Sequence, residues 1–280
     1  MRPILNFSQR YTRHSANHGF TIVELIVVIT VVGILAAGAA TFIRNPTQAY
    51  FDVENYANLT DRADTALRRL SREMRNALPN SVRATTNGAD SFVEFIPVTA
   101  AGRYRAEIGN NASDNPLDFA ASADSFDVLG APVNVGAGQQ LVIYNLGVSG
   151  ADAYEGTNRR ALATTGNLSS LSFSGGAFPQ PSPSSRFYVV GTATTYACDM
   201  TNRRLVMYSG YAIQSTQPAS ISALNALTTG RQIASNVTSC QMQYVPGALQ
   251  RSGIVLVYLG LTQDAARVNL MQQINVVNSP

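Results

Sequence analysis

Two hydrophobic patterns follow one another in the first eighty residues of the chain. From Phe20 to Ile43 the residues are almost entirely apolar, and no charged side chain lies between Glu24 and Arg44. At about 1.5 Å per residue, a helix over this stretch is long enough to cross a bilayer of about 30 Å. The pattern therefore predicts a transmembrane helix over 20–43 that contains a single carboxylate.

Beyond this segment, apolar residues recur three and four positions apart, as on one face of an amphipathic helix. The predicted face consists of Val53, Tyr56, Thr60, Ala63, Leu67, Leu70, Met74 and Ala77. Asp64 and Arg68 stand four apart among the charged residues and can form a helical ion pair. We expect this amphipathic part to cover 44–79, to end at Pro79, and to lie on a sheet of its own chain, with a coiled-coil seam as the alternative. Pro46 lies near its start and predicts a kink or local melting.

From about residue 80 the chain changes to short β-rich runs separated by Gly, Pro, Asn and Ser. The predicted strands are 91–98, 140–146, 168–173, 186–191, 194–198, 204–208, 233–244, 254–261 and 271–277. A short helix is expected over 220–227 and an exposed loop over 174–185. The sequence thus predicts an α+β fold in which a long N-terminal helix packs on an antiparallel, β-rich head covering 80–280.

The carboxylate of Glu24 is costly in an apolar helix, so it needs a reason. The segment before it contains Arg2, Arg10, Arg13, His14 and His18 and no acidic residue. This positive flank predicts a cytoplasmic N-terminus and translocation of everything after Arg44. A signal-peptidase site would follow the apolar core, whereas Gly19 precedes it. Cleavage after Gly19 would remove a basic leader, residues 1–19, and leave the apolar helix on the mature protein.

Gly19, Phe20 and Glu24, with a basic leader before them and an apolar helix after them, resemble the class III signal of type IV pilins and type II secretion pseudopilins. The resemblance implies that a prepilin peptidase cuts after Gly19 and methylates Phe20. It also implies that the Phe20 amine pairs with Glu24 of a subunit already in the filament, at an inner-membrane assembly platform. The alternative is an ordinary single-pass anchor, in which Glu24 has no partner.

Removal of the leader changes the charge balance of the chain. The sequence has 20 basic residues, all arginine, and 17 acidic residues, and the leader holds three of the arginines and no acid. The mature side chains therefore balance, and no basic excess remains for binding nucleic acid. Both histidines also lie in the leader. A mature protein without histidine or lysine excludes Ser-His-Asp and Cys-His sites, histidine-ligated zinc and Schiff-base chemistry, so we expect no enzyme and no cofactor.

The remaining candidates for chemistry are carboxylates and cysteines. The acidic residues Asp114, Asp118, Asp124 and Asp127 show no spacing that predicts two facing carboxylates, so we expect solvated loops. The oxygen-rich run 109–115 could hold calcium, but it does not match an EF-hand, so no metal site is predicted. Cys198 and Cys240 both lie on the translocated side, where a disulfide is the natural expectation and two free thiols the alternative. Such a bridge would close a loop of about 43 residues, a constraint of roughly 4 kcal/mol on the unfolded chain.

The C-terminal forty residues carry a finer resemblance, to the O-type minor pilins of MSHA pilus systems and the related J-type minor pseudopilins of type II secretion. It rests on the spacing of Cys240, Met242, Tyr244, Pro246 and Gly247, on Arg251, Gly253, Val255 and Val257, and on the tail 273–280. The resemblance implies a minor subunit that works beside other pilins in the pilus assembly or adhesion of a Gram-negative bacterium. It would first sit in the inner membrane with a periplasmic head, and later in the pilus.

Two functions of other classes remain open. One is a tip adhesin whose head binds a glycan or another surface ligand, with tyrosines as contact residues. The tyrosines considered for it are Tyr104, Tyr144, Tyr154 and Tyr211. The other is a membrane-anchored periplasmic enzyme, which the missing histidine and lysine disfavour.

Overall fold

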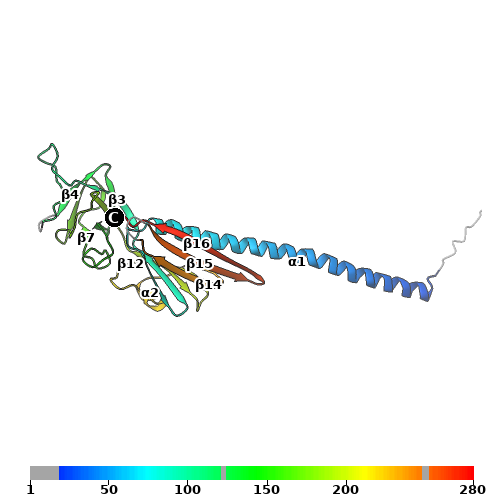
Figure 1. The fold of residues 1–280 in the computed structure, drawn as a ribbon. Helices are drawn as coiled ribbons and strands as arrows, with labels where there is room; N and C mark the ends of the chain where they lie inside the picture. The colour runs from blue at the N-terminus through cyan, green and yellow to red at the C-terminus, as the bar shows by residue number, and fades with distance from the viewer. Residues whose placement is uncertain (1–18, 121–123, 248–251) are drawn as a thin grey trace, which may run out of the picture. The chain divides into compact units, whose positions relative to one another are not determined.

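The computed structural model describes residues 19–120, 124–247 and 252–280 (Figure 1). Of the predicted leader only Gly19 lies within this range, and Arg251 lies outside it. The chain divides between Val53 and Glu54 into two compact units. The second unit contains the end of the long helix and all strands. The predicted α+β fold, with an apolar N-terminal helix and an antiparallel β-rich head, is confirmed.

Helix α1 spans Ile22–Arg75. It is assigned without a break through Pro46, so the expected local melting there is wrong. The helix also ends before Pro79, because the chain turns to join the sheet. Ala77 forms a bridge with Pro97, and the Leu78 N–H donates to the carbonyl of Ile96 at 2.8 Å.

A five-stranded antiparallel sheet forms the centre of the head. Its strands, in spatial order, are β1 (Arg83–Asn87), β2 (Asp90–Phe95), β11 (Ala193–Asp199), β12 (Arg204–Tyr211) and β13 (Arg231–Ser235). Every residue of the central strand β11 is buried. The predicted strands 194–198 and 204–208 fall in this sheet. The predicted strand 91–98 does so only up to Phe95, because Val98 begins the next strand, and β1 was not predicted.

The last three strands form a second antiparallel sheet. They are β14 (Val237–Val245), β15 (Gly253–Gln263) and β16 (Ala266–Val276), in that order. The predicted strand 233–244 is wrong as one element, because it is divided between β13 and β14. Asn236 separates them with φ of 58°, a left-handed conformation that asparagine tolerates better than most residues.

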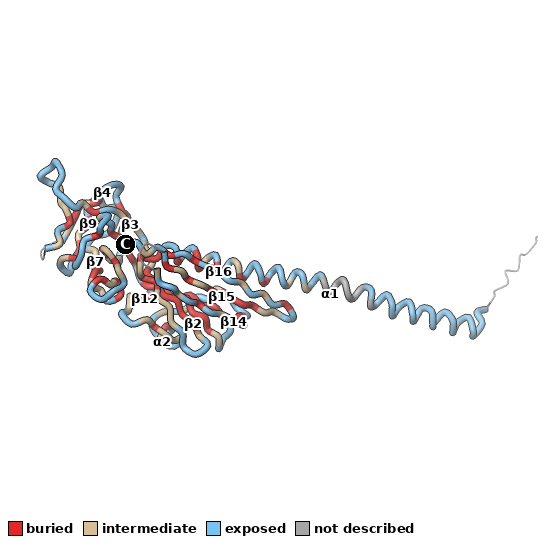
Figure 2. The backbone as a smooth tube through the Cα atoms, in the orientation of Figure 1, coloured by how far each residue is buried: buried red, intermediate tan, exposed pale blue. Residues whose placement is uncertain are grey.

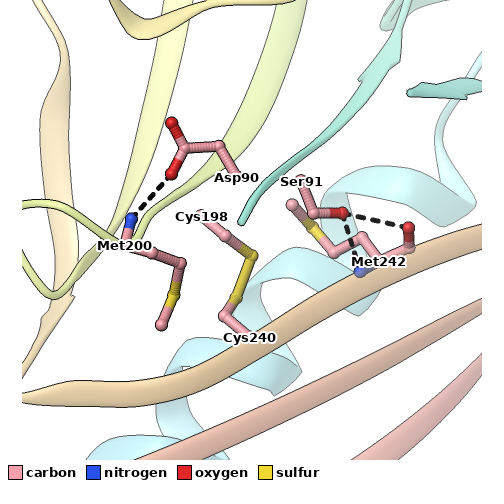
Figure 3. The surroundings of a disulfide bond; sticks show 6 residues. All are labelled: Asp90, Ser91, Cys198, Met200, Cys240 and Met242. Atoms are coloured by element: carbon pink, nitrogen blue, oxygen red, sulfur yellow. Dashed lines mark hydrogen bonds between the residues drawn. A yellow bond between two sulfur atoms is a disulfide. The ribbon is translucent and has the colours of Figure 1, made fainter. Parts of the chain in front are cut away.

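The two sheets are joined side by side without a ladder of backbone hydrogen bonds between β2 and β14 (Figure 3). The Ser91 hydroxyl takes the place of one rung: it accepts the Met242 N–H at 2.9 Å and donates to the Met242 carbonyl at 3.1 Å. Beside it, Cys198 of β11 and Cys240 of β14 form a disulfide with a Cα–Cα distance of 5.8 Å. A hydroxyl and a covalent bond thus fix the register between the sheets.

The C-terminal part of α1 packs on both sheets rather than in a coiled-coil seam, as the buried residues in Figure 2 show. The buried residues of α1 are Leu59, Ala63, Ala66, Leu67, Leu70, Ser71 and Met74, and Ala77 is buried just after the helix ends. Three residues of the predicted face, Val53, Tyr56 and Thr60, are exposed instead. Leu59 and Ala66 belong to the core in their place. Leu59 is the first core residue of the helix, because the contact between α1 and the sheets begins there.

The opposite face of the five-stranded sheet is covered by α2 (Ile221–Leu227). Its Leu224 is fully buried in a cluster with Phe92, Val206 and Tyr208. Ser220 caps the helix by accepting the Ala223 N–H at 3.1 Å. The predicted short helix over 220–227 is therefore confirmed.

A small closed barrel is inserted between β2 and β11. Its strands, in order around the barrel, are β10 (Arg186–Val190), β3 (Val98–Tyr104), β4 (Ser125–Leu129), β9 (Ser170–Ser174), β7 (Arg159–Leu162) and β6 (Gln140–Ile143). A separate pair consists of β5 (Val133–Val135) and β8 (Gly166–Leu168). The sequence predicted no barrel, and β3, β4, β5 and β7 were missed. These strands are short, and they close on one another only in three dimensions.

Aromatic side chains fill the barrel. Phe126 lies at its centre, with ring centroids 5.4 Å from Phe187 and 6.3 Å from Phe173. Phe178 stacks against Phe173 at 5.2 Å and is 2% exposed. The segment 174–185 was predicted to be an exposed loop. Most of it is exposed, but Phe178 and Ser182 are buried and close the end of the barrel.

Candidate functional site: the start of the apolar helix

The first part of α1 exposes its apolar side chains to the surroundings. The span Ile22–Ala40 has a mean hydropathy of 2.6 and no buried residue. Leu35, for example, is 66% exposed. The hydroxyl of Thr30 donates to the carbonyl of Ile26 at 2.9 Å, which satisfies this polar group within the helix. An apolar surface of this extent requires lipid or other helices around it, and it fits a single-pass membrane anchor.

Glu24 lies in the first turn of this helix. Its N–H donates to the hydroxyl of Thr21 at 3.2 Å, so Thr21 caps the helix that begins at Ile22. The sequence Thr21-Ile-Val-Glu24 has the spacing of a capping box, a signal that the sequence reasoning missed. A carboxylate in the first turn is also stabilised by the helix dipole. Glu24 therefore has a local role in the helix besides any role between subunits.

Gly19 and Phe20 precede the helix and are exposed. Phe20 is 76% exposed, and neither residue belongs to a helix or strand. A peptide bond in an extended, exposed segment is accessible to a protease. The structure thus places Gly19, Phe20 and Glu24 within one short stretch at the start of α1.

The carboxylate of Glu24 forms no ion pair with any residue that the structure describes. The six ion pairs of the described chain all lie in the second unit: Asp64–Arg68, Arg69–Glu73, Arg83–Glu94, Arg105–Asp114, Arg105–Asp127 and Asp199–Arg204. A charge surrounded by apolar side chains in lipid would be unstable without a counter-charge.

The head contains one buried carboxylate that the sequence reasoning missed. Glu94 is fully buried, with one oxygen 2.7 Å from Nε of Arg83 and the other accepting the Tyr211 hydroxyl at 2.8 Å. Burial raises the pKa of Glu94, and the bonds from Arg83 and Tyr211 oppose that rise. Arg83 also lies over the ring of Tyr154, 3.6 Å from its centroid. Because every charged group here has a partner, the cluster is structural.

A local signal for this cluster was present in the sequence. Asn87-Gly88 is a typical hairpin signal in a sequence. In the structure Asn87 pairs with Asp90, so Gly88 and Ala89 form the two-residue turn, and Gly88 has φ of 60°. In the hairpin that follows, Arg83 stands directly opposite Glu94. The turn could thus have predicted β1 and this ion pair.

The aspartates before and within β4 were expected in solvated loops, and for two of them this is wrong. Arg105 lies 3.2 Å from Asp114 and 3.5 Å from Asp127, so it holds both. Asp118 accepts the N–H of Ala120, and Asp124 accepts the Ser125 hydroxyl. Within the described ranges, no three His, Cys, Asp or Glu side chains gather as a metal site would require.

The tyrosines considered for a glycan-binding surface are mostly internal. Tyr104, Tyr154 and Tyr211 are at most 5% exposed, and Tyr144 is half-buried. Tyr104 bonds to Ser182, and Tyr154 donates to the carbonyl of Ser81 at 2.8 Å. These side chains pack the head and do not form an exposed aromatic platform.

Comparison with known proteins gives one match. Residues 14–40 match the family model of the prokaryotic N-terminal methylation motif. No curated protein and no solved structure matches the chain. The matched range contains Gly19, Phe20 and Glu24 and nearly all of the exposed apolar helix. The chain therefore carries a type IV pilin/pseudopilin-type N-terminal signal, and this signal supports a pilin-like protein whose apolar helix fits a single-pass membrane anchor.

Proposed function

We propose that this protein is a minor subunit of a type IV pilus, most similar to the O-type minor pilins of MSHA systems, and that it supports filament assembly and adhesion. The observation that carries the proposal is the methylation motif over residues 14–40, which coincides with an exposed apolar helix. In this motif Glu24 is the only charged residue of the helix before Arg44, and it has no cation among the described residues.

In this proposal a prepilin peptidase cleaves between Gly19 and Phe20 and methylates the new amine. Methylation keeps the positive charge of the amine and adds apolar surface. The mature chain stays in the inner membrane of a Gram-negative bacterium with its head in the periplasm. An assembly platform then inserts it beside other pilins.

The chemistry of assembly follows from the two opposite charges. Phe20 and Glu24 are about one helical turn apart, at the same end of the helix. The Phe20 amine of an incoming subunit can reach Glu24 of the subunit already in the filament. Each charge then satisfies the other, and the pair sets the axial register more than it adds stability.

The minor role is supported by the head. Its compact unit covers Glu54–Pro280 and includes a barrel inserted between β2 and β11. A head of this size is difficult to repeat along a whole filament, whereas a subunit present in few copies avoids that constraint. A minor pseudopilin of type II secretion is the alternative, because it would share the same N-terminal motif.

The processing step is tested by sequencing the N-terminus of the membrane-extracted protein. The expected sequence begins at methylated Phe20. A chain that keeps residues 1–19 in cells with an active prepilin peptidase would overturn the proposal.

The role of Glu24 is tested by two substitutions that separate its charge from its place in the capping box. Glu24→Gln removes the charge but keeps a residue that suits a capping box, while Glu24→Val removes the polar side chain altogether. Both variants keep the backbone N–H that donates to Thr21. We expect both variants to be cleaved and membrane-inserted, and both to be poorly incorporated into sheared filaments. If Glu24→Gln assembles like the wild type, the charge of Glu24 is not required for assembly and the proposed ion pair is wrong.

A further inference from the structure

The outer face of the C-terminal sheet is uncharged along most of its length. Residues directly opposite one another in antiparallel strands share a face, and Tyr258 of β15 stands opposite Gln241 of β14 and Met271 of β16. By the same register, this face also carries Ser239, Gln243, Val245, Ile254, Leu256, Asn269, Gln273 and Asn275. The alternate residues, which include Met242, Val255, Val257 and Ile274, belong to the core shared with α1. We refer to the uncharged surface, on which Tyr258 is 42% exposed, as the open face.

A groove follows the open face where it meets the β1–β2 hairpin. It consists of two adjoining hollows of about 440 Å³ and about 470 Å³, and Thr86 of β1 lines both of them. The open face contributes Ser239, Gln241 and Tyr258 to the first hollow, and Gln243 and Val245 to the second. At roughly 3.4 Å per residue, the groove thus follows β14 for about 20 Å. Each hollow has the volume of a small-molecule site.

The polar side chains of the groove are free to bind a ligand. Within the described ranges, the side chains of Thr86, Gln241, Gln243 and Tyr258 form no hydrogen bond. An amide group can both donate and accept, and a tyrosine adds an apolar ring and a hydroxyl. Asp90 is the only charged residue among the described residues that line the groove, and it accepts the Met200 N–H at 2.9 Å (Figure 3). The groove therefore offers amides, hydroxyls and an aromatic ring, but no cation.

This composition selects among the possible ligands. A phosphate, a nucleic acid or an acidic sugar would need a cation, and none of the described lining residues supplies one. An extended peptide would pair with the backbone edge of β14. That edge is interrupted at Met242, because its N–H and its carbonyl are both bonded to the Ser91 hydroxyl (Figure 3). A neutral sugar fits the groove, since its hydroxyls can bond to amides and its C–H face can pack on an aromatic ring.

We propose that this groove binds a neutral oligosaccharide, with one sugar ring on Tyr258 and sugar hydroxyls bonded to Gln241 and Gln243. Tyr258 is a different residue from the mostly internal tyrosines described above. The inference names the ligand class for the adhesion in the proposed function, and it rests on that function for its biological role. The binding itself is a property of the head and can be measured apart from filament assembly.

Binding is tested with the full chain in a polyoxyethylene detergent, because detergents with sugar head groups would compete. The probes are neutral oligomers of hexoses and N-acetylhexosamines, and sulfated forms of the same oligomers are the acidic set. We expect a neutral oligomer to bind and its sulfated form to bind more weakly. Tyr258→Val and the double variant Gln241→Ala/Gln243→Ala should each weaken binding about tenfold. The matched control Gln273→Ala removes an amide that lies on the open face but outside the groove, and it should bind like the wild type.

A footprint locates the ligand without relying on a loss of binding. Thr86 is exposed and lines both hollows, and the native cysteines are bonded to each other. In Thr86→Cys, the neutral oligomer at about ten times its Kd should slow the reaction of the new thiol with a maleimide about tenfold. The same oligomer should leave the thiol of Gln273→Cys as reactive as before.

Several outcomes would overturn the inference. If no neutral oligomer binds, or if the sulfated form binds more tightly, the ligand class is wrong. If the groove variants bind like the wild type, or if Thr86→Cys is not protected, the sugar binds elsewhere. Peptides selected from a random library that protect Thr86→Cys, in the absence of any sugar that does so, would show that the groove holds a peptide.

These outcomes are distinct from a failure of the proposed function. A chain that begins at methylated Phe20 and enters filaments, but binds no neutral sugar, would overturn only the inference about the groove. A chain that binds the sugar, but keeps residues 1–19 and never enters filaments, would overturn only the proposed function.

Discussion

Leu35 and Leu70 belong to the same helix but to opposite environments. Leu35 is 66% exposed in a segment with no buried residue, whereas Leu70 is fully buried against the two sheets of the head. The head part of α1 thus finds its apolar partners within its own chain. The N-terminal part finds none among the described residues, so it depends on lipid or on other subunits.

Glu94 in the head and Glu24 at the start of α1 differ in the same way in their surroundings. Glu94 is fully buried, and Arg83 and Tyr211 hold both of its oxygens. Glu24 has a backbone cap from Thr21 but no cation in the described chain. The partners of Glu94 lie within the chain and stabilise the fold of the head. In the proposed function, the partner of Glu24 comes from a neighbouring subunit. Under this proposal, the contrast separates a structural residue, Glu94, from an assembly residue, Glu24.

The largest expected effect is the loss of the buried glutamate. Glu94→Ala leaves Arg83 without its partner and should lower the free energy of unfolding of the head by about 3–5 kcal/mol. Glu24→Ala should leave the unfolding of the head within about 0.5 kcal/mol of the wild type. Chemical denaturation of the detergent-solubilised chain, followed by tyrosine fluorescence, measures both. Equal losses in the two variants would contradict the contrast between the two glutamates.

The leucines give the next test. Leu70→Ala creates a cavity between α1 and the sheets and should cost about 2–5 kcal/mol of unfolding free energy. Leu35→Ala is the matched control, and we expect no change in the unfolding of the head. A destabilised head in the Leu35 variant would show that the N-terminal part of α1 packs on the head after all.

The disulfide sharpens the comparison, because the covalent cross-link lies in the head alone among the described residues. Replacing both Cys198 and Cys240 by Ser should cost about 2–4 kcal/mol, since the bond joins the two sheets and constrains the unfolded chain. The loss is measured by denaturation of the oxidised wild type and of the double variant. A variant as stable as the wild type would show that the Ser91–Met242 bonds suffice to join the sheets.

The smallest expected effect is a pH dependence from Glu94. Burial raises the pKa of Glu94 in the folded head above the ordinary glutamate value of 4.5. The folded state therefore holds this proton more tightly than the unfolded state does, so the contribution of Glu94 to stability falls as pH rises through the folded pKa. Between neutral pH and about pH 5, acidification should stabilise the wild type relative to Glu94→Gln. Parallel pH profiles of the two proteins would show that Glu94 stays ionised throughout.

Local patterns were enough wherever one segment carries its own signal. The hydrophobic run before Arg44 predicted the apolar helix, and the short helix expected over 220–227 is α2. The methylation motif found over 14–40 agrees with the spacing of Gly19, Phe20 and Glu24. These features depend on residues close in the chain, whose spacing can be read directly.

Contacts between distant residues decided the rest. The barrel closes because short strands from Val98 to Val190 pair in an order that no single strand encodes. The start of the helix–sheet contact at Leu59 depends on where the sheets lie, and not on the periodicity of α1, which continues on either side. By itself the sequence determined the anchor, the candidate assembly residues and the class of fold. Only the tertiary structure decided which charges are satisfied within the chain and which are left for a neighbour, because that depends on side chains brought together from distant positions.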